Sequence, residues 1–313
     1  MMLGRAPWAR RTATASVVLY GQRSSSYSSS SEDLDGAAAR IARARRVVAF
    51  TGAGLSAESG IPTYRAALEA QGRGLWDGFR GALALAFFGT KIGWLVAPSY
   101  AWALYVDRLL GPISRAEPNA AHAALADLDA CLAAGVPVIT QNVDGLCQRA
   151  GARDVIEVHG TVLTYRHAWT GASLGPAVGG TGSPGAFARP DVVFFGEALG
   201  AAYFRAEDVV EALGDGDVMI VVGCSCAVAP AGLLPYKSML QGAHVIEVNL
   251  RKELATSFQR TIPSPDDAFG PAAALPVGRP VDLDGRQTFL RGSAASVLPA
   301  LVAAVRAKTK DGS

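Results

Sequence analysis

The sequence predicts an α/β protein built on a doubly wound parallel sheet, with a small second lobe formed by insertions. Short runs of β-branched and other apolar residues alternate with longer alanine-rich segments. This alternation is typical of strands that are buried on both faces and joined by helices. The chain has 313 residues, of which half are apolar and 18% charged, so it is long enough to bury one large core.

The first predicted strand, residues 46–51, leads into Gly52-Ala53-Gly54, and residues 56–59 are expected to open a helix. Runs of the same strand type follow at residues 136–140, 155–158, 192–195, 218–222 and 245–248. Helical patterns are found at residues 119–133, 201–213, 229–241 and 294–307, and a short basic helix is expected from Ala37.

Two segments interrupt the alternation of strands and helices. Residues 75–111 are apolar, contain tryptophan and are expected to be helical, whereas residues 161–188 are rich in Gly, Ser, Ala and Pro without clear periodicity. We expect both to form the small lobe, over about 66–116 and 160–188, with a cleft between it and the sheet. One domain would then cover residues 37–308, with residues 263–280 as a loop and residues 309–313 as a tail.

The N-terminal segment has the composition of an organelle transit peptide. The first 31 residues contain four arginines and no acidic residue, and they end in a serine-rich run. We therefore expect residues 1–36 to stay outside the fold and to direct the protein to the mitochondrial matrix, with a plastid as an alternative. A plain disordered tail on a cytoplasmic protein is the remaining reading.

The charges and the apolar runs argue against two classes of partner. A net charge of +2 gives no electrostatic case for binding nucleic acid. The most apolar run, residues 81–98, is interrupted by Lys91 and by glycines, so it reads as a core helix or a pocket wall rather than a membrane span.

Cysteine usage indicates neither a disulfide framework nor a cysteine zinc site. No pair has the CxxC spacing of such a site. The four cysteines are Cys131, Cys147, Cys224 and Cys226, and all lie in apolar stretches.

The glycine turn after the first strand suits a pyrophosphate. Glycine lets main-chain N–H groups approach an anion, and the start of a helix adds a favourable dipole. Gly52-Ala53-Gly54 lacks a third glycine, however, so the turn by itself is weak evidence for a dinucleotide site.

Six blocks together make the sequence resemble the sirtuin family. They occur in the family's order over nearly all of residues 37–302. The blocks are residues 52–65 (GAGLSAESGIPTYR), 140–146 (TQNVDGL), 159–160 (HG), 189–197 (RPDVVFFGE), 223–225 (GCS) and 248–249 (VN). The resemblance implies a Rossmann-like sheet, NAD as co-substrate, and removal of acyl groups from lysines of proteins or peptides.

The resemblance also implies where NAD would bind. Its phosphates would lie on Gly52, Ala53, Gly54 and Ala57, below a loop that carries Tyr64 and Arg65. The nicotinamide and its ribose would contact Gln141, Asn142 and Asp144. The adenosine half would contact Gly223, Ser225 and Asn249, which follow two later strands at the sheet edge where doubly wound folds bind dinucleotides.

His159 would be the general base. In the implied reaction the acyl-lysine oxygen displaces nicotinamide, and His159 removes a ribose hydroxyl proton, a task that suits an imidazole of near-neutral pKa. The products would be free lysine, nicotinamide and O-acyl-ADP-ribose. The substrate backbone would pair with the segment that contains Val193, Phe195, Gly196 and Glu197.

A Tyr-x-x-Arg pattern suggests which acyl groups are removed. Tyr105 and Arg108 are three residues apart on an expected helix, so they share a face and can bind one carboxylate. The pattern resembles that of class III sirtuins, which remove succinyl, malonyl and glutaryl groups, and Thr63 agrees with the same class. We therefore expect an acyl pocket that prefers acidic groups.

One departure from the family concerns zinc. Most sirtuins carry four zinc-binding cysteines after the catalytic histidine, but residues 160–188 contain no cysteine, and His167 alone cannot hold a structural zinc. We therefore expect no metal. If a small lobe without zinc binds acyl peptides weakly, the favoured alternative activity is protein mono-ADP-ribosylation. A non-catalytic sensor of NAD or ADP-ribose is the second alternative.

Overall fold

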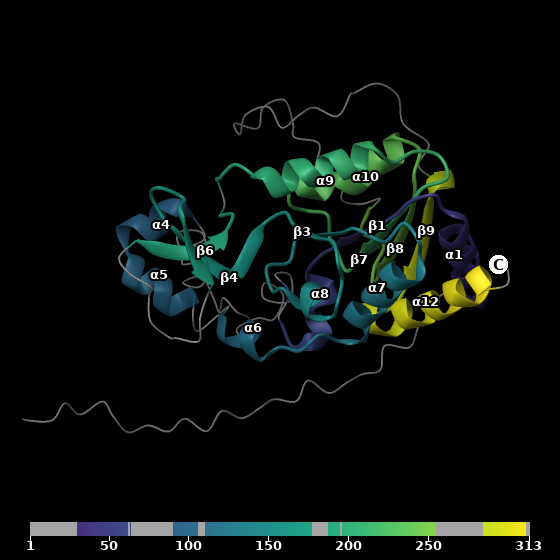
Figure 1. The fold of residues 1–313 in the computed structure, drawn as a ribbon, viewed down its shortest axis with the longest axis horizontal. Helices are drawn as coiled ribbons and strands as arrows, with labels where there is room; N and C mark the ends of the chain where they lie inside the picture. Colours follow the sequence, from purple (N-terminus) through teal and green to yellow (C-terminus); the bar gives the residue numbers. More distant parts are fainter. Residues whose placement is uncertain are drawn as a thin grey trace, which may run out of the picture.

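The computed structural model has a large lobe built on a parallel sheet and a small lobe beside it (Figure 1). It describes residues 30–61, 63, 90–105, 110–176, 187–194, 196–254 and 284–310, and all structural statements below concern these residues.

The main sheet is parallel, with the strand order β3-β2-β1-β7-β8-β9. Its strands are β1 (Val47–Thr51), β2 (Val138–Thr140), β3 (Val155–Glu157), β7 (Val218–Val222), β8 (His244–Asn249) and β9 (Gln287–Arg291). From β1 the chain builds outward to β3 and later returns to β7 on the other side of β1. The boundary between β1 and β7 is therefore the switch point at which such sheets bind ligands. The expected fold class is confirmed, and β9 is an additional strand.

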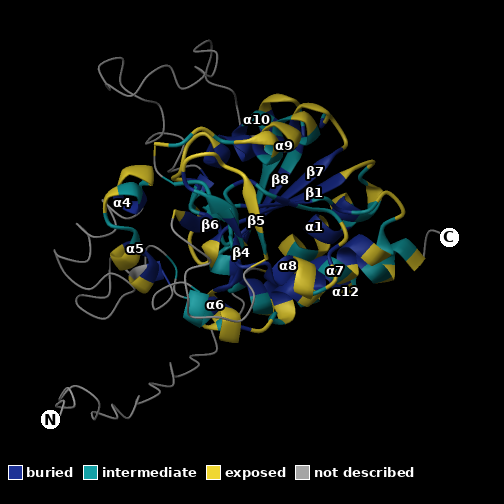
Figure 2. Cartoon of the chain, turned by 60° about the vertical axis from the view of Figure 1, so that its left-hand side comes forward, coloured by how far each residue is buried: buried dark blue, intermediate teal, exposed yellow. Residues whose placement is uncertain are grey.

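Helices cover both faces of this sheet (Figures 1 and 2). One face carries α1 (Ser31–Arg43), α7 (Ala120–Cys131) and α12 (Ala294–Lys310), and the other carries α9 (Ala201–Glu211) and α10 (Leu234–Leu240). Side chains of β7 alternate between the two cores, because Ile220 packs with the first set of helices and Val221 with the second. Burial on both sides explains why these strands are continuously apolar.

Helix α1 begins at Ser31, six residues before the boundary at 36/37 expected from the sequence. Ser30 and Asp33 form a capping box that starts it, and Ala37, Ala38 and Ile41 bury its apolar face in the core. The first turn of this helix contains the acidic residues Glu32 and Asp33. The transit-peptide composition of the preceding residues therefore ends where the helix begins.

The small lobe combines helices α4 (Lys91–Val96) and α5 (Pro98–Tyr105) with an antiparallel sheet. The sheet has the order β5-β4-β6, formed by β4 (Gly160–His167), β5 (Ser173–Pro176) and β6 (Ala188–Val192). A short helix, α6 (Gly111–Arg115), leads from this lobe back to α7.

Several expected elements differ in the structure. Residues 192–195 were expected to form a strand of the parallel sheet, which is wrong: β6 ends at Val192 and pairs with β4. The run is apolar because Val192 and Phe194 pack against the apolar cluster of the small lobe. Strands β4 and β5 lie at residues 160–167 and 173–176, where composition did not indicate strands.

The expected helix at residues 56–59 is also absent from the described chain. Two 3-10 turns, η1 (Ala53–Leu55) and η2 (Ala57–Ser59), take its place, and Gly60 ends them at a φ of 83°. The expected loop at 263–280 lies outside the described residues. Within the described chain, no helix combines the length and apolarity that a membrane crossing requires.

Candidate active site

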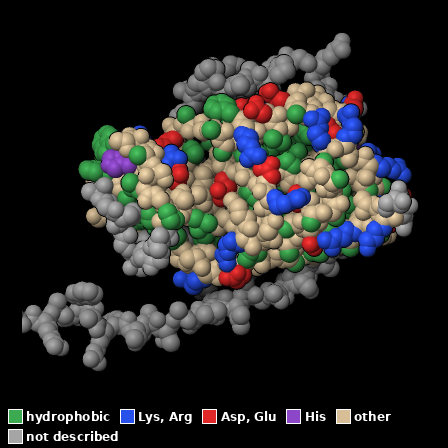
Figure 3. All heavy atoms as spheres, in the orientation of Figure 1, with side chains coloured by type: hydrophobic (Ala, Val, Ile, Leu, Met, Phe, Trp, Pro, Cys, Tyr) green, Lys and Arg blue, Asp and Glu red, His purple; other side chains and the backbone are tan. Residues whose placement is uncertain are grey.

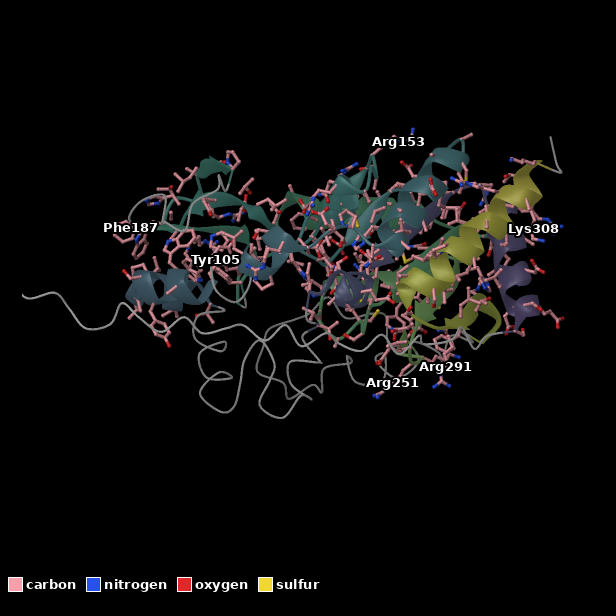
Figure 4. The ribbon with its side chains drawn as sticks, turned by 90° about the horizontal axis from the view of Figure 1, so that it is seen from below. Tyr105, Arg153, Phe187, Arg251, Arg291 and Lys308 are labelled. Carbon is pink, nitrogen blue, oxygen red and sulfur yellow. The ribbon has the colours of Figure 1, made fainter. Side chains whose placement is uncertain are left out.

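The residues expected to bind NAD lie at one edge of the main sheet. Those that the structure describes follow β1, β2 and β7 or end β8, and His159 follows β3. Because these strands are parallel, their carboxyl ends meet at that edge. The edge includes the switch point between β1 and β7. Tyr105, by contrast, ends helix α5 and packs in the small lobe (Figure 4). The structure therefore separates the predicted cofactor residues from the predicted acyl-binding residue by lobe.

The glycine turn after β1 packs main chain against main chain. Gly54 N donates to Gly223 O at 2.8 Å, and a Cβ on Gly54 would lie 2.6 Å from the Gly223 Cα atom. Gly223 itself has a φ of 56°, in the left-handed region that favours glycine. Only glycine fits either position, so peptide groups rather than side chains form this part of the site.

Ser56 is the centre of a buried polar network below this turn. Its Oγ donates to Asp144 Oδ2 at 2.7 Å and accepts from Asn142 Nδ2 at 3.1 Å. Asn142 Nδ2 also donates to Gly52 O at 3.1 Å. The second carboxylate oxygen of Asp144 accepts from Leu146 N at 2.9 Å. Asp144 is thus used by protein partners beneath the site, while Asn142 joins the ends of β1 and β2.

His122 completes this network and was missed by the sequence analysis. The main-chain N–H of Asn119 donates to His122 Nδ1 at 3.2 Å, so the proton of the neutral ring is on Nε2, which lies 3.3 Å from Ser56 Oγ. Burial lowers the pKa of His122, and the nearby Asp144 opposes that shift. The available signal was Pro118-Asn119, a helix start that places His122 at the third position of α7.

His159 lies after β3, half-buried at the same edge. Its Nδ1 is 3.2 Å from the main-chain oxygen of Gln141, an acceptor only, so Nδ1 carries the proton and Nε2 keeps a lone pair. Burial lowers the pKa of His159, and the bond to Gln141 offsets part of that shift. The ring is therefore held neutral and oriented, as a general base requires.

The side chain of Gln141 bridges β2 and β7. Its Nε2 donates to Cys224 Sγ at 3.2 Å, and the Cys224 carbonyl accepts from Asn249 Nδ2 at 3.0 Å. Two of the residues expected to surround NAD, Gln141 and Asn249, are thus hydrogen-bonded to Cys224 in the segment after β7, where Ser225 also lies.

Tyr105 belongs to an aromatic cluster in the small lobe. We use this name for Trp94, Trp102, Tyr105, Tyr165 and Phe194. The Tyr105 hydroxyl donates to Val162 O at 2.9 Å, and burial, followed by the neighbouring Tyr165, raises its pKa far above the usual value. The hydroxyl proton of Tyr105 is therefore bound to a main-chain oxygen, although the hydroxyl oxygen can still accept a hydrogen bond.

The indole N–H of Trp102 lies in the same cluster and has no hydrogen-bond partner among the described residues. Trp102 is only 7% exposed, and its Nε1 atom is buried with no hydrogen-bond acceptor. Its ring lies 5.5 Å from that of Tyr105 and 5.2 Å from that of Tyr165, measured between centroids. The cluster thus contains an unused donor, and no motif in the sequence pointed to Trp102.

The expected peptide-binding segment begins beside His159. Val193 N donates to His159 O at 2.9 Å, and Glu197 forms a bidentate ion pair with Arg189. Gly196 has a φ of 82° and is exposed. Tyr64, Arg65, Arg108 and Phe195 lie outside the described residues.

In the described part of the small lobe, His167 has a local role. Its Nδ1 accepts from the main-chain N–H groups of Trp169 and Thr170 at 3.3 Å, and its ring lies 6.0 Å from that of Phe187. Figure 3 shows that apolar side chains are exposed at this end of the molecule. No three His, Cys, Asp or Glu gather as a metal site in the described chain. The absence of zinc stays a prediction, since residues 177–186 are not described.

Comparison with known proteins identifies the family. A model described as the Sir2 family matches residues 52–230. The NAD-dependent protein deacylase of Aeropyrum pernix is 43% identical over 218 residues, which are 67% of this chain and 82% of that protein. NAD-dependent protein deacylase 1 of Pseudomonas aeruginosa is 39% identical over 223 residues, 67% of this chain and 84% of its own length.

The solved structures agree. A Sir2 homologue in complex with NAD superimposes with a TM-score of 0.67 at 31% identity, covering 88% of this chain and 94% of that one. The family match covers the glycine turn, the segment after β2, His159 and the Arg189–Glu197 segment. The chain therefore belongs to the Sir2 family, the sirtuins.

Proposed function

We propose that this protein removes acyl groups ending in a carboxylate, such as succinyl, malonyl or glutaryl, from lysine side chains of proteins. The broader activity follows from the family: the protein is an NAD-dependent protein deacylase that uses NAD as co-substrate. The preference for acidic acyl groups is the more specific proposal, and it rests on the aromatic cluster of the small lobe.

The edge at β1 and β7 fits NAD. Gly54 and Gly223 approach so closely that no side chain can enter, so a pyrophosphate at this turn would lie against main chain beside the start of η1. We assign the phosphates to Gly52, Ala53, Gly54 and Ala57. Gln141 and Asn142 would contact the nicotinamide ribose, with Asp144 supporting them from below, and Gly223, Ser225 and Asn249 would contact the adenosine half.

His159 is assigned as the general base. When bound, NAD supplies a ribose whose bond to nicotinamide is broken as the acyl oxygen attacks. The lone pair on His159 Nε2 would then accept a ribose hydroxyl proton, because Nδ1 is engaged with Gln141 O. The family chemistry gives O-acyl-ADP-ribose, nicotinamide and free lysine as products.

The unpaired N–H of Trp102 is the observation that carries the acyl preference. A buried donor without an acceptor costs about 1–3 kcal/mol, and a ligand that accepts from it removes that cost. The methyl end of an acetyl group cannot accept, whereas a carboxylate can. The Tyr105-x-x-Arg108 pattern supports placing the acyl pocket at this cluster. Because the Tyr105 hydroxyl donates to Val162 O, the carboxylate would be bound by Trp102 Nε1 and by Arg108.

The test compares succinyl-lysine and acetyl-lysine in the same peptide. Wild-type protein should have the higher kcat/KM for succinyl-lysine. Arg108→Met should lower that value by roughly tenfold to a hundredfold, because a charged hydrogen bond contributes about 1.5–3 kcal/mol, and should affect acetyl-lysine little. Arg115→Met, at an exposed arginine of α6, is the matched control. Equal losses on both substrates would mean an ordinary deacetylase.

Mitochondrial import stays a prediction, because residues 1–29 lie outside the described residues. Fusing residues 1–36 to a fluorescent protein would test it. A diffuse cytoplasmic signal would contradict it.

A further inference from the structure

We infer that the Arg189–Glu197 ion pair is a positioning device that holds the peptide-binding segment in register with the acyl pocket and with His159. The inference rests on the proposed function of this site and deepens it. It assigns a role to Arg189, for which the sequence analysis had none. Neither residue of the pair is expected to touch the reacting atoms.

The pair is bidentate and largely buried. Arg189 Nη1 lies 2.9 Å from Glu197 Oε2, and Nη2 lies 2.9 Å from Oε1, with the two side chains 4% and 17% exposed. Two parallel bonds fix the relative orientation of the two planar groups, which a single bond cannot do. The pair therefore fixes the distance between the start of β6 and Glu197, the last residue of the peptide-binding segment.

The Glu197 carboxylate also bonds to the main chain of the segment that lies between Arg189 and Glu197. Its Oε2 accepts from Phe194 N at 3.1 Å, and Glu197 N donates to Phe194 O at 3.0 Å. Phe194 and Glu197 are thus joined by a main-chain and a side-chain hydrogen bond, and Gly196, which precedes Glu197, is exposed. The described ladder between β4 and β6 ends at the pair Gly160 and Val192, so these bonds replace strand pairing beyond that point.

Two series of contacts connect the ion pair to the rest of the site. The guanidinium carbon of Arg189 lies 4.7 Å from the centroid of the Phe194 ring, which stacks on Trp94 at 5.6 Å and 19°. Trp94 in turn lies 6.0 Å from Tyr105. On the other side, Val193 N donates to His159 O. One ion pair thus orients the wall of the acyl pocket and the segment bonded to the catalytic histidine.

The geometry predicts a specific kinetic effect. An edge segment binds a peptide through main-chain groups, so its misplacement weakens binding of the peptide whatever acyl group it carries. NAD would bind at the edge of the main sheet, in the other lobe, and should be affected little. A residue that served only general stability would instead lower the amount of active protein and leave both KM values unchanged.

The experiment uses the full chain and measures KM for NAD, for an acetyl-lysine peptide and for a succinyl-lysine peptide. Arg189→Met should raise KM about tenfold or more for both peptides and change KM for NAD less than about twofold. Arg189→Lys keeps the charge but not the fork, and it should give an intermediate value. Arg166→Met is the matched control, because Arg166 is the β4 partner of Arg189 and pairs with Asp191 rather than with Glu197.

Three results would overturn the inference: a fall in kcat with unchanged peptide KM, an equal rise in KM for NAD, or the same peptide effect in Arg166→Met. If Arg189→Met does not fold, Glu197→Gln, which keeps an acceptor for Phe194 N, replaces it and should show the same pattern with a smaller rise. A wild-type protein without preference for succinyl-lysine would contradict the acyl preference alone, since the effect of Arg189 is read on both peptides.

Discussion

The imidazole of His159 is bound through Nδ1 to the main-chain oxygen of Gln141, at 3.2 Å, and this single contact determines which nitrogen can act as a base. Because Gln141 directly follows β2 and His159 lies just after β3, the pairing of these two strands sets the orientation of the ring. Burial then keeps the ring neutral.

The acid limb of the pH profile should lie below pH 6.5, the ordinary pKa of a histidine. Burial lowers the pKa of His159, so the neutral ring, which is the active form, persists to lower pH and is lost only as pH falls through the lowered pKa. The measurement is kcat/KM for an acyl-lysine peptide between pH 5 and 8. If kcat/KM were already lost as pH falls through a value above 7, a different group would be the base.

His159→Ala should reduce deacylation by roughly a hundredfold or more, which is the usual scale for loss of a general base. NAD affinity, measured by titration calorimetry, should change little, because the contacts assigned to NAD lie on other strands. His167→Ala in the small lobe is the control and should keep near-normal turnover. Near-normal turnover in His159→Ala would show that the assignment is wrong.

Trp102→Phe should lower kcat/KM for succinyl-lysine by about tenfold or more and leave acetyl-lysine nearly unchanged. The ring remains for packing, but the buried N–H that would bind the carboxylate is removed. The melting temperature should fall little, because the substitution removes a buried N–H group that makes no hydrogen bond. Trp169→Phe, at an exposed tryptophan, should change neither substrate. A parallel loss on both peptides would assign Trp102 to packing.

Gly54→Ala should weaken NAD binding at least about tenfold and lower the melting temperature. Its Cβ would lie 2.6 Å from the Gly223 Cα atom, and main chain held by β7 cannot move aside cheaply. Gly36→Ala is the matched control: no atom lies within 4 Å of its Cβ, and it should stabilise α1 by about 0.5–1 kcal/mol. Normal NAD affinity in Gly54→Ala would contradict the phosphate assignment.

Protein purified without chelator should contain no stoichiometric zinc, because residues 160–188 hold no cysteine and a single histidine. Elemental analysis checks this directly. About one zinc per chain would imply ligands from other parts of the sequence.

Local patterns in the sequence were enough to predict the parallel sheet and the position of its edge. Strands such as β7 are apolar on both faces, a property of each segment that requires no knowledge of its neighbours. The same holds for the glycine turn after β1 and for His159, since parallel strands must bring the residues after them to one edge. Strand β6 was misjudged because an apolar run indicates burial without saying which cluster buries it.

Hydrogen-bond partners far apart in the chain were decided only by the tertiary structure. Ser56 and Asp144 are 88 residues apart, and Tyr105 and Val162 are 57 apart. No periodicity relates such positions, because a side chain takes whichever partner packing brings within about 3 Å. The sequence therefore determined which residue types reach the site, whereas the packing of the two lobes decided that Asp144 supports Ser56, that Tyr105 donates to the main chain, and that Trp102 keeps an unused donor.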